Sequence, residues 1–354
     1  MSIIQWFTLE RIATLSLIGL LGLTFDLLSI PTWFTPAPHK LARQAQLPLK
    51  SPLIEISGMT RHLARPHHYW VHNDSLDQAR MFLVNHHGKL ISEHHVTLSQ
   101  RGLVNNIDWE DITSTGHDVY EGDRVLYVAD SGNNFHWRDD LKVYAFSEPK
   151  TDHEPLSLLR TYAYRFPYQS RHPPQNYSWR DGRCLDSEAL FWWRDELFLI
   201  SKCVFGGPTL LWRLPREELI PSGELTGELT LKPTSLLPIQ PAPHPLSERV
   251  TGASIDLTSN ILAVLTYRSV WFFHLSGSPQ TPQVRALFRC ALSRASAQPV
   301  QQAEAIEWSV HQRPDIRGQR STLRSLLILT EGRGVHTLSV DFSSQECPHE
   351  STTL

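Results

Sequence analysis

Short apolar strands that end in polar residues recur along most of the chain. The runs 70–74, 127–131, 198–202, 263–267 and 327–331 each begin with apolar residues and end abruptly in two polar ones. Another short apolar run precedes each of them. Strands of this length, separated by turns rich in Gly, Asp and Asn, are typical of antiparallel sheets. We therefore expect five sheets of similar construction.

The triplets that open the first strand of each sheet support this alignment. They begin at Ser57, Glu110, Glu188, Thr251 and Glu304, at intervals of 53 to 78 residues. Self-similarity on this scale indicates a repeat architecture, and short strands favour a β-propeller over a helical solenoid. We predict an all-β, five-bladed β-propeller. A six-bladed propeller is the alternative, because residues 159–180 hold a further apolar run. The expected repeats are 57–98, 106–166, 185–239, 250–292 and 304–342.

The repeats fill most of the 354 residues, so we expect one propeller domain over residues 46–343 and no second domain. Residues 47–56 would supply the outermost strand of the last blade and so close the ring. Three prolines make residues 31–45 an extended linker. Residues 344–354 would form a loose C-terminal tail.

The one long apolar run covers residues 12–30 and predicts an N-terminal apolar helix within residues 1–30. Its length is near the roughly 20 residues that span a bilayer. No small-residue cleavage site follows it, which favours a signal anchor over a cleaved signal peptide, the alternative. We therefore expect a cell-envelope protein anchored in the inner membrane, with its propeller outside the cytoplasm, in the periplasm or the extracellular space.

Charge and cysteine content narrow the function further. A net charge of −3 argues against nucleic-acid binding, which needs a basic face. The four cysteines are compatible with an oxidising compartment. Cys184 and Cys203 flank the first two strands of the third repeat at the same end, and we predict a disulfide between them.

The residues that open the triplets and the polar residues that end the following strands should meet at one mouth of the propeller. The first strand of each blade lies nearest the axis, and the chain enters it at the end where the second strand exits. The inner ring would then be Ser57, Glu110, Glu188, Thr251 and Glu304. The rim, our candidate ligand-binding set, would be Asn73, Asp74, Asp130, Asn133, Arg138, Lys202, Tyr267, Arg268, Glu331 and Arg333.

Three glutamates that converge on one axis would repel one another unless some are protonated, each bonds to neighbouring backbone N–H groups, or a cation lies among them. Calcium accepts six to eight oxygen ligands with flexible geometry, whereas magnesium demands a near-ideal octahedron. The inner ring holds no Cys or His, which disfavours zinc and copper. The inner ring is therefore a candidate calcium site. The alternative is that the glutamates only link adjacent blades through hydrogen bonds.

The triplets, together with the A-D-S-G-N-N-x3-R sequence at 129–138, resemble a group of exported bacterial propellers that are distantly similar to esterase-like phytase propellers. The ring also resembles the central calcium site of calcium-activated nucleotidases, five-bladed propellers with a Ser, Glu, Glu, Ser, Glu ring. Thr251 departs from that pattern but retains a hydroxyl. This resemblance implies a calcium ion. The nucleotide-contacting residues of that family have no match here, so nucleotidase activity is not implied.

Two functions remain open. The first is a membrane-tethered propeller that binds a small molecule, a glycan or a protein at its mouth. The alternative is a calcium-dependent phosphoester or ester hydrolase at the same mouth, with Asp74 or Asp111 as the base. Its candidate catalytic residues are Asp74, Asp111, Asp130, Lys202 and Glu331. The binding function is favoured because a propeller fold does not by itself imply catalysis.

Overall fold

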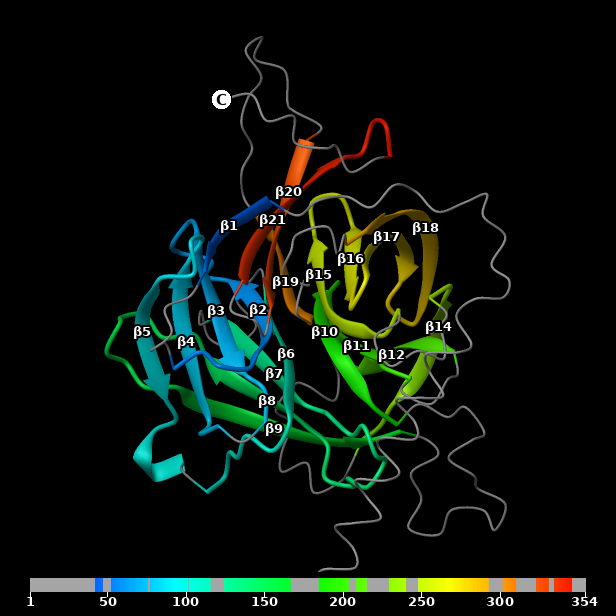
Figure 1. The fold of residues 1–354 in the computed structure, drawn as a ribbon. Helices are drawn as coiled ribbons and strands as arrows, with labels where there is room; N and C mark the ends of the chain where they lie inside the picture. The colour runs from blue at the N-terminus through cyan, green and yellow to red at the C-terminus, as the bar shows by residue number, and fades with distance from the viewer. Residues whose placement is uncertain are drawn as a thin grey trace, which may run out of the picture. The chain divides into compact units, whose positions relative to one another are not determined.

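Five antiparallel sheets are arranged as the blades of a β-propeller in the computed structural model (Figure 1). The structure describes residues 42–46, 52–75, 77–100, 102–115, 124–166, 185–203, 208–214, 229–239, 248–292, 302–309, 323–330 and 334–345. The predicted five-bladed, all-β architecture is therefore confirmed. The apolar run 159–180 makes no sixth blade within the described residues, because 157–165 form the outer strand of the second blade.

Each blade begins with its inner strand and is built outward along the chain. The first blade comprises β2 (Ile56–Arg61), β3 (His68–Asn73), β4 (Arg80–Asn85) and β5 (Leu90–His95). A short 3-10 helix, η1 (Leu98–Gln100), leads to the second blade, β6 (Trp109–Ser114), β7 (Val125–Asp130), β8 (Lys142–Ser147) and β9 (Ser157–Arg165). The two-residue strand β13 (Leu229–Thr230) pairs with β9 in parallel.

The remaining blades follow the same plan. The third comprises β10 (Ser187–Trp193), β11 (Glu196–Ser201), β12 (Thr209–Leu214) and β14 (Lys232–Leu237). The fourth comprises β15 (Val250–Asp256), β16 (Ile261–Thr266), β17 (Ser269–Ser278) and β18 (Thr281–Ala291). The fifth comprises β19 (Ala303–Ser309), β20 (Leu323–Thr330), β21 (Gly334–Asp341) and β1 (Ala42–Gln46).

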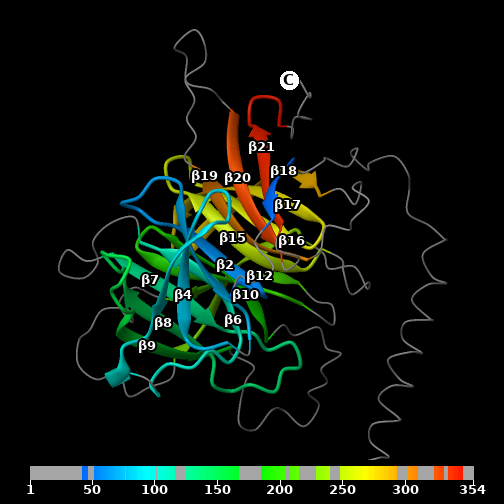
Figure 2. The ribbon, with the colours of Figure 1, turned by 60° about the vertical axis from the view of Figure 1, so that its left-hand side comes forward.

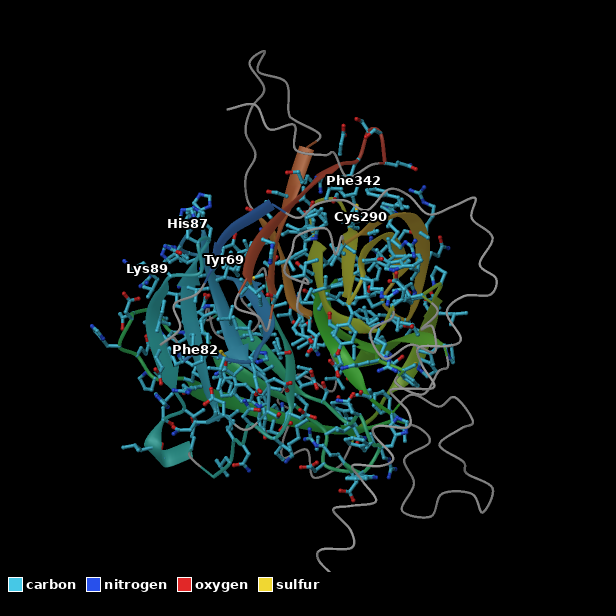
Figure 3. The ribbon with its side chains drawn as sticks, in the orientation of Figure 1. Tyr69, Phe82, His87, Lys89, Cys290 and Phe342 are labelled. Carbon is cyan, nitrogen blue, oxygen red and sulfur yellow. The ribbon has the colours of Figure 1, made fainter. Side chains whose placement is uncertain are left out.

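The hydrophobic core consists of five clusters, each of which fills the space between two neighbouring blades. Tyr69 and Phe82 of the first blade pack with Leu327 and Leu329 of the fifth, so the last interface closes the ring (Figure 3). Alternate residues of a strand point to opposite faces of its sheet. The second strands, such as β7, β11 and β16, are covered on both faces and are largely apolar, whereas outer strands such as β5 and β18 are partly exposed and more polar.

The closing strand lies upstream of its predicted place. We expected residues 47–56 to complete the last blade, but β1 (Ala42–Gln46) does so, pairing antiparallel with β21 beside β20 (Figure 2). Residues 42–45 therefore belong to the propeller and not to the predicted linker. The sequence A-R-Q-A-Q has no apolar alternation, so its pattern gave no strand signal.

Every inner strand contains a β-bulge near its start. One residue is skipped in the pairing with the second strand: Gly58, Glu110, Glu188, Thr251 and Glu304. A bulge of this kind bends the strand and re-aims the extra side chain, and bulges are frequent next to functional sites. Four of the five residues predicted for the inner ring are thus equivalent. Ser57 is not, because the bulge of the first blade falls on Gly58.

Several predictions fall outside the described residues. These are the apolar helix of residues 1–30, the tail of residues 346–354, and the rim residues Glu331 and Arg333. Among the described residues, no helix combines the length and the apolar character that crossing a bilayer requires. Cys203 and Cys290 both take part in disulfide bonds. Cys184 is not described, so its pairing with Cys203 stays a prediction.

Candidate cation site at one end of the propeller

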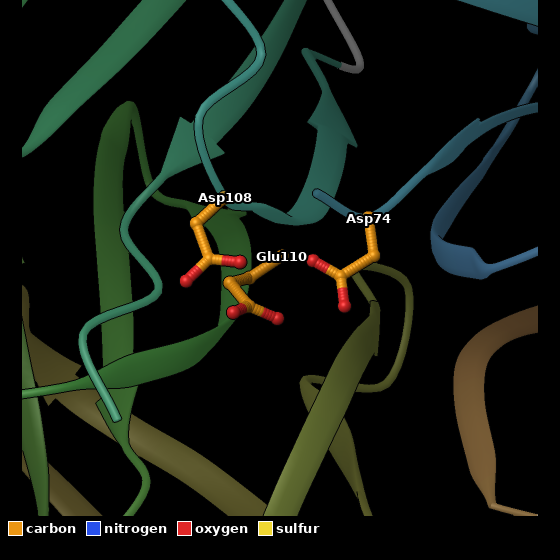
Figure 4. Close-up of side chains that lie close together, drawn as sticks. All are labelled: Asp74, Asp108 and Glu110. Carbon is orange, nitrogen blue, oxygen red and sulfur yellow. The ribbon is translucent and has the colours of Figure 1, made fainter. Parts of the chain in front are cut away.

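Three carboxylates from the first two blades converge at the end of the axis where the inner strands begin. Asp74, Asp108 and Glu110 each offer an oxygen, and these oxygens all lie within 4.8 Å of one another (Figure 4). Glu110 is buried, and the two aspartates are half-buried. It is the one such group of three or more potential metal-ligating side chains that the described part of the chain contains.

Hydrogen bonds from neighbouring loops hold the three carboxylates in place. Asp74 follows β3, and the side-chain amide of Asn106 donates to its backbone oxygen at 2.6 Å. The backbone N–H of Asp108 donates to Asp130 at 3.1 Å, and its carbonyl accepts from the N–H groups of Ser131 and Gly132. Glu110 is the bulge residue of β6. Hydrogen bonds to the backbone thus bring together residues whose carboxylates repel one another.

Gly132 makes room for this group. A Cβ atom at that position would lie 2.1 Å from Oε1 of Glu110 and 2.3 Å from Oδ2 of Asp108. Any other residue would therefore displace these two carboxylates. The glycine of the S-G-N-N sequence serves the site through its missing side chain.

Burial and mutual repulsion raise the pKa values of the group's carboxyls. Burial raises the pKa of Asp74 to about 8, and the neighbouring Asp108 and Glu188 carboxylates add to the rise. Burial also raises the pKa of Glu110 well above its usual value, with further contributions from Glu188 and Asp74. Like charges this close oppose simultaneous ionisation.

A mixed group of charges surrounds the three carboxylates. The ammonium of Lys202 forms an ion pair with the buried Glu188 and lies 5.5 Å from the ring centre of Tyr267. Asp186 is fully buried and accepts a hydrogen bond from the N–H of Asn133 at 2.7 Å. Burial and the nearby Glu188 raise its pKa well above the usual value. Lys202 therefore neutralises Glu188 and leaves the other carboxylates in excess.

Two residues of the predicted inner ring connect blades instead of facing the cluster. Ser57 donates its hydroxyl hydrogen to the backbone oxygen of Glu110 at 2.5 Å, and Thr251 donates to that of Ala303 at 2.7 Å. Both hydrogen bonds connect adjacent blades, the role that our alternative interpretation gave to the glutamates. Glu304, the fifth member, is nearly buried and interacts electrostatically with Tyr267.

The predicted rim divides into residues near the site and residues that shape loops. The side chain of Asn73 bonds to Ile54, Pro52 and Asp77. Asn133 and Arg138 brace the β7–β8 loop, and Arg138 forms an ion pair with the buried Asp130 at 2.8 Å.

Burial raises the pKa of Asp130 to about 6, although Arg138 opposes the rise. Arg268 is exposed. Of the described rim residues, Asp74 belongs to the acidic group and Asp130 bonds to the backbone of Asp108. Lys202 and Tyr267 lie beside the neighbouring Glu188.

Asp111 lies inside the propeller, where it joins three blades. One carboxylate oxygen accepts the N–H groups of Leu190 and Ala253 at 2.8 and 3.2 Å, and the other accepts the N–H of Ile112 at 2.8 Å. Its side chain is almost fully buried, and burial raises its pKa well above the usual value. Because backbone donors occupy this carboxylate, it is poorly available as a general base.

Sequence reasoning missed Asp108 and Asp186. Both stand two residues before a bulge glutamate, in D-W-E at 108–110 and D-S-E at 186–188. The shared D-x-E spacing in the second and third repeats was the signal that could have identified them. The alignment by triplets began at the glutamates and so excluded the preceding aspartates.

A different polar pocket lies at the opposite end of the inner strands. Its lining includes Thr60, Ser114, Ser254 and Glu307. Glu307 pairs with Arg61 at 3.3 Å and accepts the hydroxyl of Ser254 at 2.8 Å. The excess of carboxylates is thus a property of one end of the axis.

No protein-family model matches the sequence, and no curated protein does. A structure of a nidogen/laminin complex is similar with 10% identity over 84% of this chain and 79% of that one, at a TM-score of 0.39.

A periplasmic gluconolactonase of Pseudomonas aeruginosa gives 14% identity, coverage of 82% and 70%, and a TM-score of 0.37. The major allergen Mala s 1 of Malassezia sympodialis is similar with 10% identity over 79% of this chain and 77% of that one, at a TM-score of 0.37. No activity or site residue is carried over from these proteins.

Proposed function

We propose that this chain is a cell-envelope binding propeller whose acidic end holds a divalent cation, with calcium the best-suited ion. The observation that carries the proposal is the convergence of oxygens from Asp74, Asp108 and Glu110 within 4.8 Å. Such a group is costly without a cation, because neighbouring carboxylates repel one another in a partly buried site. The cation would neutralise the three carboxylates and would coordinate oxygen atoms of a ligand.

The chemistry of the donors favours calcium. Carboxylate oxygens are hard ligands, which suit calcium, magnesium and manganese better than zinc or copper. Calcium tolerates an irregular shell in which water completes the coordination, whereas magnesium requires a near-ideal octahedron. One buried oxygen of Asp186 also has no hydrogen-bond partner among the described residues, which supports a further polar occupant nearby.

Disulfide bonding supports a location outside the cytoplasm. Cys203 and Cys290 are both bonded, and disulfides persist mainly in oxidising compartments. The apolar run at 12–30 would anchor the chain in the inner membrane, with the propeller on the periplasmic or extracellular side.

The charge balance favours binding over phosphoester hydrolysis. Around the three carboxylates the described residues add Asp186, Glu188 and Glu304, against the cations Lys202 and Arg249. With one divalent ion bound and all six carboxylates ionised, this end would keep a net negative charge and would repel an anionic phosphoester. Phosphoryl transfer instead needs cationic clamps around the substrate.

A hydrolysis assay separates the two functions. Phosphoester and carboxylic-ester panels are incubated with the full-length chain, with calcium and with a chelator, and repeated with Glu188→Gln. We expect no calcium-dependent turnover of any substrate, but a rise in melting temperature with calcium. Turnover that requires calcium and is lost in Glu188→Gln would replace the binding function by the hydrolase.

A further inference from the structure

Two large aromatic side chains stand exposed on the loop between β7 and β8. Phe135 is 65% exposed and Trp137 is 81% exposed. Their rings are stacked, with centroids 5.0 Å apart and planes inclined by 25°. Residues of this size are mostly buried in folded proteins, and exposed ones often mark contact surfaces. Neither ring contributes to the five core clusters.

The loop that carries them is firmly held. The side chain of Asn133 donates to the backbone oxygen of Leu185 at 3.0 Å and accepts the N–H of Arg138 at 2.9 Å. The N–H of His136 donates to the carbonyl of Asn133 at 2.8 Å, closing a tight turn. A rigid aromatic anchor loses little conformational entropy on binding a partner.

The aromatic pair is close in sequence to the acidic group. Gly132, three residues before Phe135, would contact Glu110 and Asp108 through any Cβ atom. The cation nearest the pair in sequence, Arg138, forms ion pairs with Asp130 and Asp140. The loop that carries the aromatic rings therefore begins against the acidic group, at the end of the propeller where carboxylates outnumber cations.

We propose that Phe135, Trp137 and the half-buried carboxylates of Asp74 and Asp108 form a surface that docks a basic polypeptide segment, with an arginine of the partner stacked on Trp137. A guanidinium is attracted both by an aromatic face and by nearby carboxylates. An open, strongly exposed surface suits an extended chain better than a small ligand, which needs an enclosing pocket. The inference rests on the proposed function in taking this end as the binding face, but it does not require the ion.

The test uses fluorescence polarisation of a labelled hexa-arginine peptide with the full-length chain, in chelator and in calcium. We expect saturable binding that weakens with added salt and is weaker in calcium. Trp137→Ala should reduce the affinity about tenfold. Leu257→Ala, which alters a 39% exposed side chain in the β15–β16 turn at the opposite end, should leave it unchanged.

Two results would overturn the inference: equal affinity of the Trp137→Ala and Leu257→Ala variants, or displacement of the peptide by neutral maltoheptaose. Calcium titration of the same samples distinguishes a failure of the docking proposal from a failure of the calcium proposal. Calcium binding without peptide binding would remove only the docking surface. Peptide binding without calcium binding would remove only the ion.

Discussion

At the scale of single residues, the candidate cation site depends on the absence of a side chain at Gly132. Gly132→Ala would push its Cβ against Glu110 and Asp108, both of which can move because the clashing atoms are carboxylate ends. We therefore expect calcium affinity to fall about tenfold, as for other displaced supports of a metal site. Unfolding free energy should change by less than about 1 kcal/mol. Calorimetric titration with urea unfolding measures both quantities, and unchanged affinity would contradict the geometry.

Asp111 allows a graded test of its structural role. Asp111→Asn keeps one oxygen for the N–H groups of Leu190 and Ala253, so it should lower the unfolding free energy by about 1 kcal/mol. Asp111→Ala removes every acceptor and should cost about 3 kcal/mol. Urea unfolding gives both values. Two variants as stable as the parent would show that the three amides find other acceptors.

His62 should make the propeller sensitive to acid. Its Nδ1 accepts the N–H of Ala64 at 3.2 Å, its ring stacks on Trp70, and burial, aided by Arg65 and Arg124, lowers its pKa to about 4. The unfolded chain, with a histidine pKa near 6.5, binds the proton more tightly, so this stability is present above pH 6.5 and is lost as the pH falls toward 4.

The loss between pH 7 and 4.5 should be about 2 kcal/mol. His62→Phe keeps the stacking and removes the titration, so the difference in unfolding free energy between the two proteins should shift by this amount over that range. A difference that stays constant with pH would contradict the neutral, buried histidine.

At the scale of elements, ring closure depends on β1. Its loss would expose the edge of β21 and remove the ladder that joins Ala42–Gln46 to residues 334–337. A chain that begins at residue 48 should therefore melt about 5 °C below one that begins at residue 38, for a loss of about 3 kcal/mol. Equal melting temperatures would mean that β1 adds nothing to the closed propeller.

The sequence predicted the blades well because their second strands are buried on both faces and are largely apolar. It misplaced the closing strand because an outer strand such as A-R-Q-A-Q carries no apolar pattern. The bulges explain why Ser57 was wrongly aligned with Glu110. The sequence alone does not show which residue is skipped in the strand pairing, so S-G-M was aligned with E-D-I one position out of step. Asp108 was missed because it precedes its strand and reaches the site only through the loop.

At the scale of the whole molecule, the blades differ in what they bring to the axis. The first two contribute Asp74, Asp108 and Glu110, the third contributes the Glu188–Lys202 pair, and the fourth contributes Tyr267. The candidate site is therefore an asymmetric group near the junction of the first two blades, whereas the sequence predicted a ring of five equal members. A cation there would join those two blades and should raise the stability of the entire propeller by mass action.

Calcium titration by isothermal calorimetry tests this account most directly, with the parent chain, Asp108→Asn and Asp195→Asn compared after removal of metal. Asp195 is an exposed acid in the β10–β11 turn and serves as the matched control. We predict one strong site in the parent and in Asp195→Asn, and loss of that site in Asp108→Asn with its circular dichroism unchanged. No calcium binding by the parent, or equal binding by Asp108→Asn, would contradict the central claim.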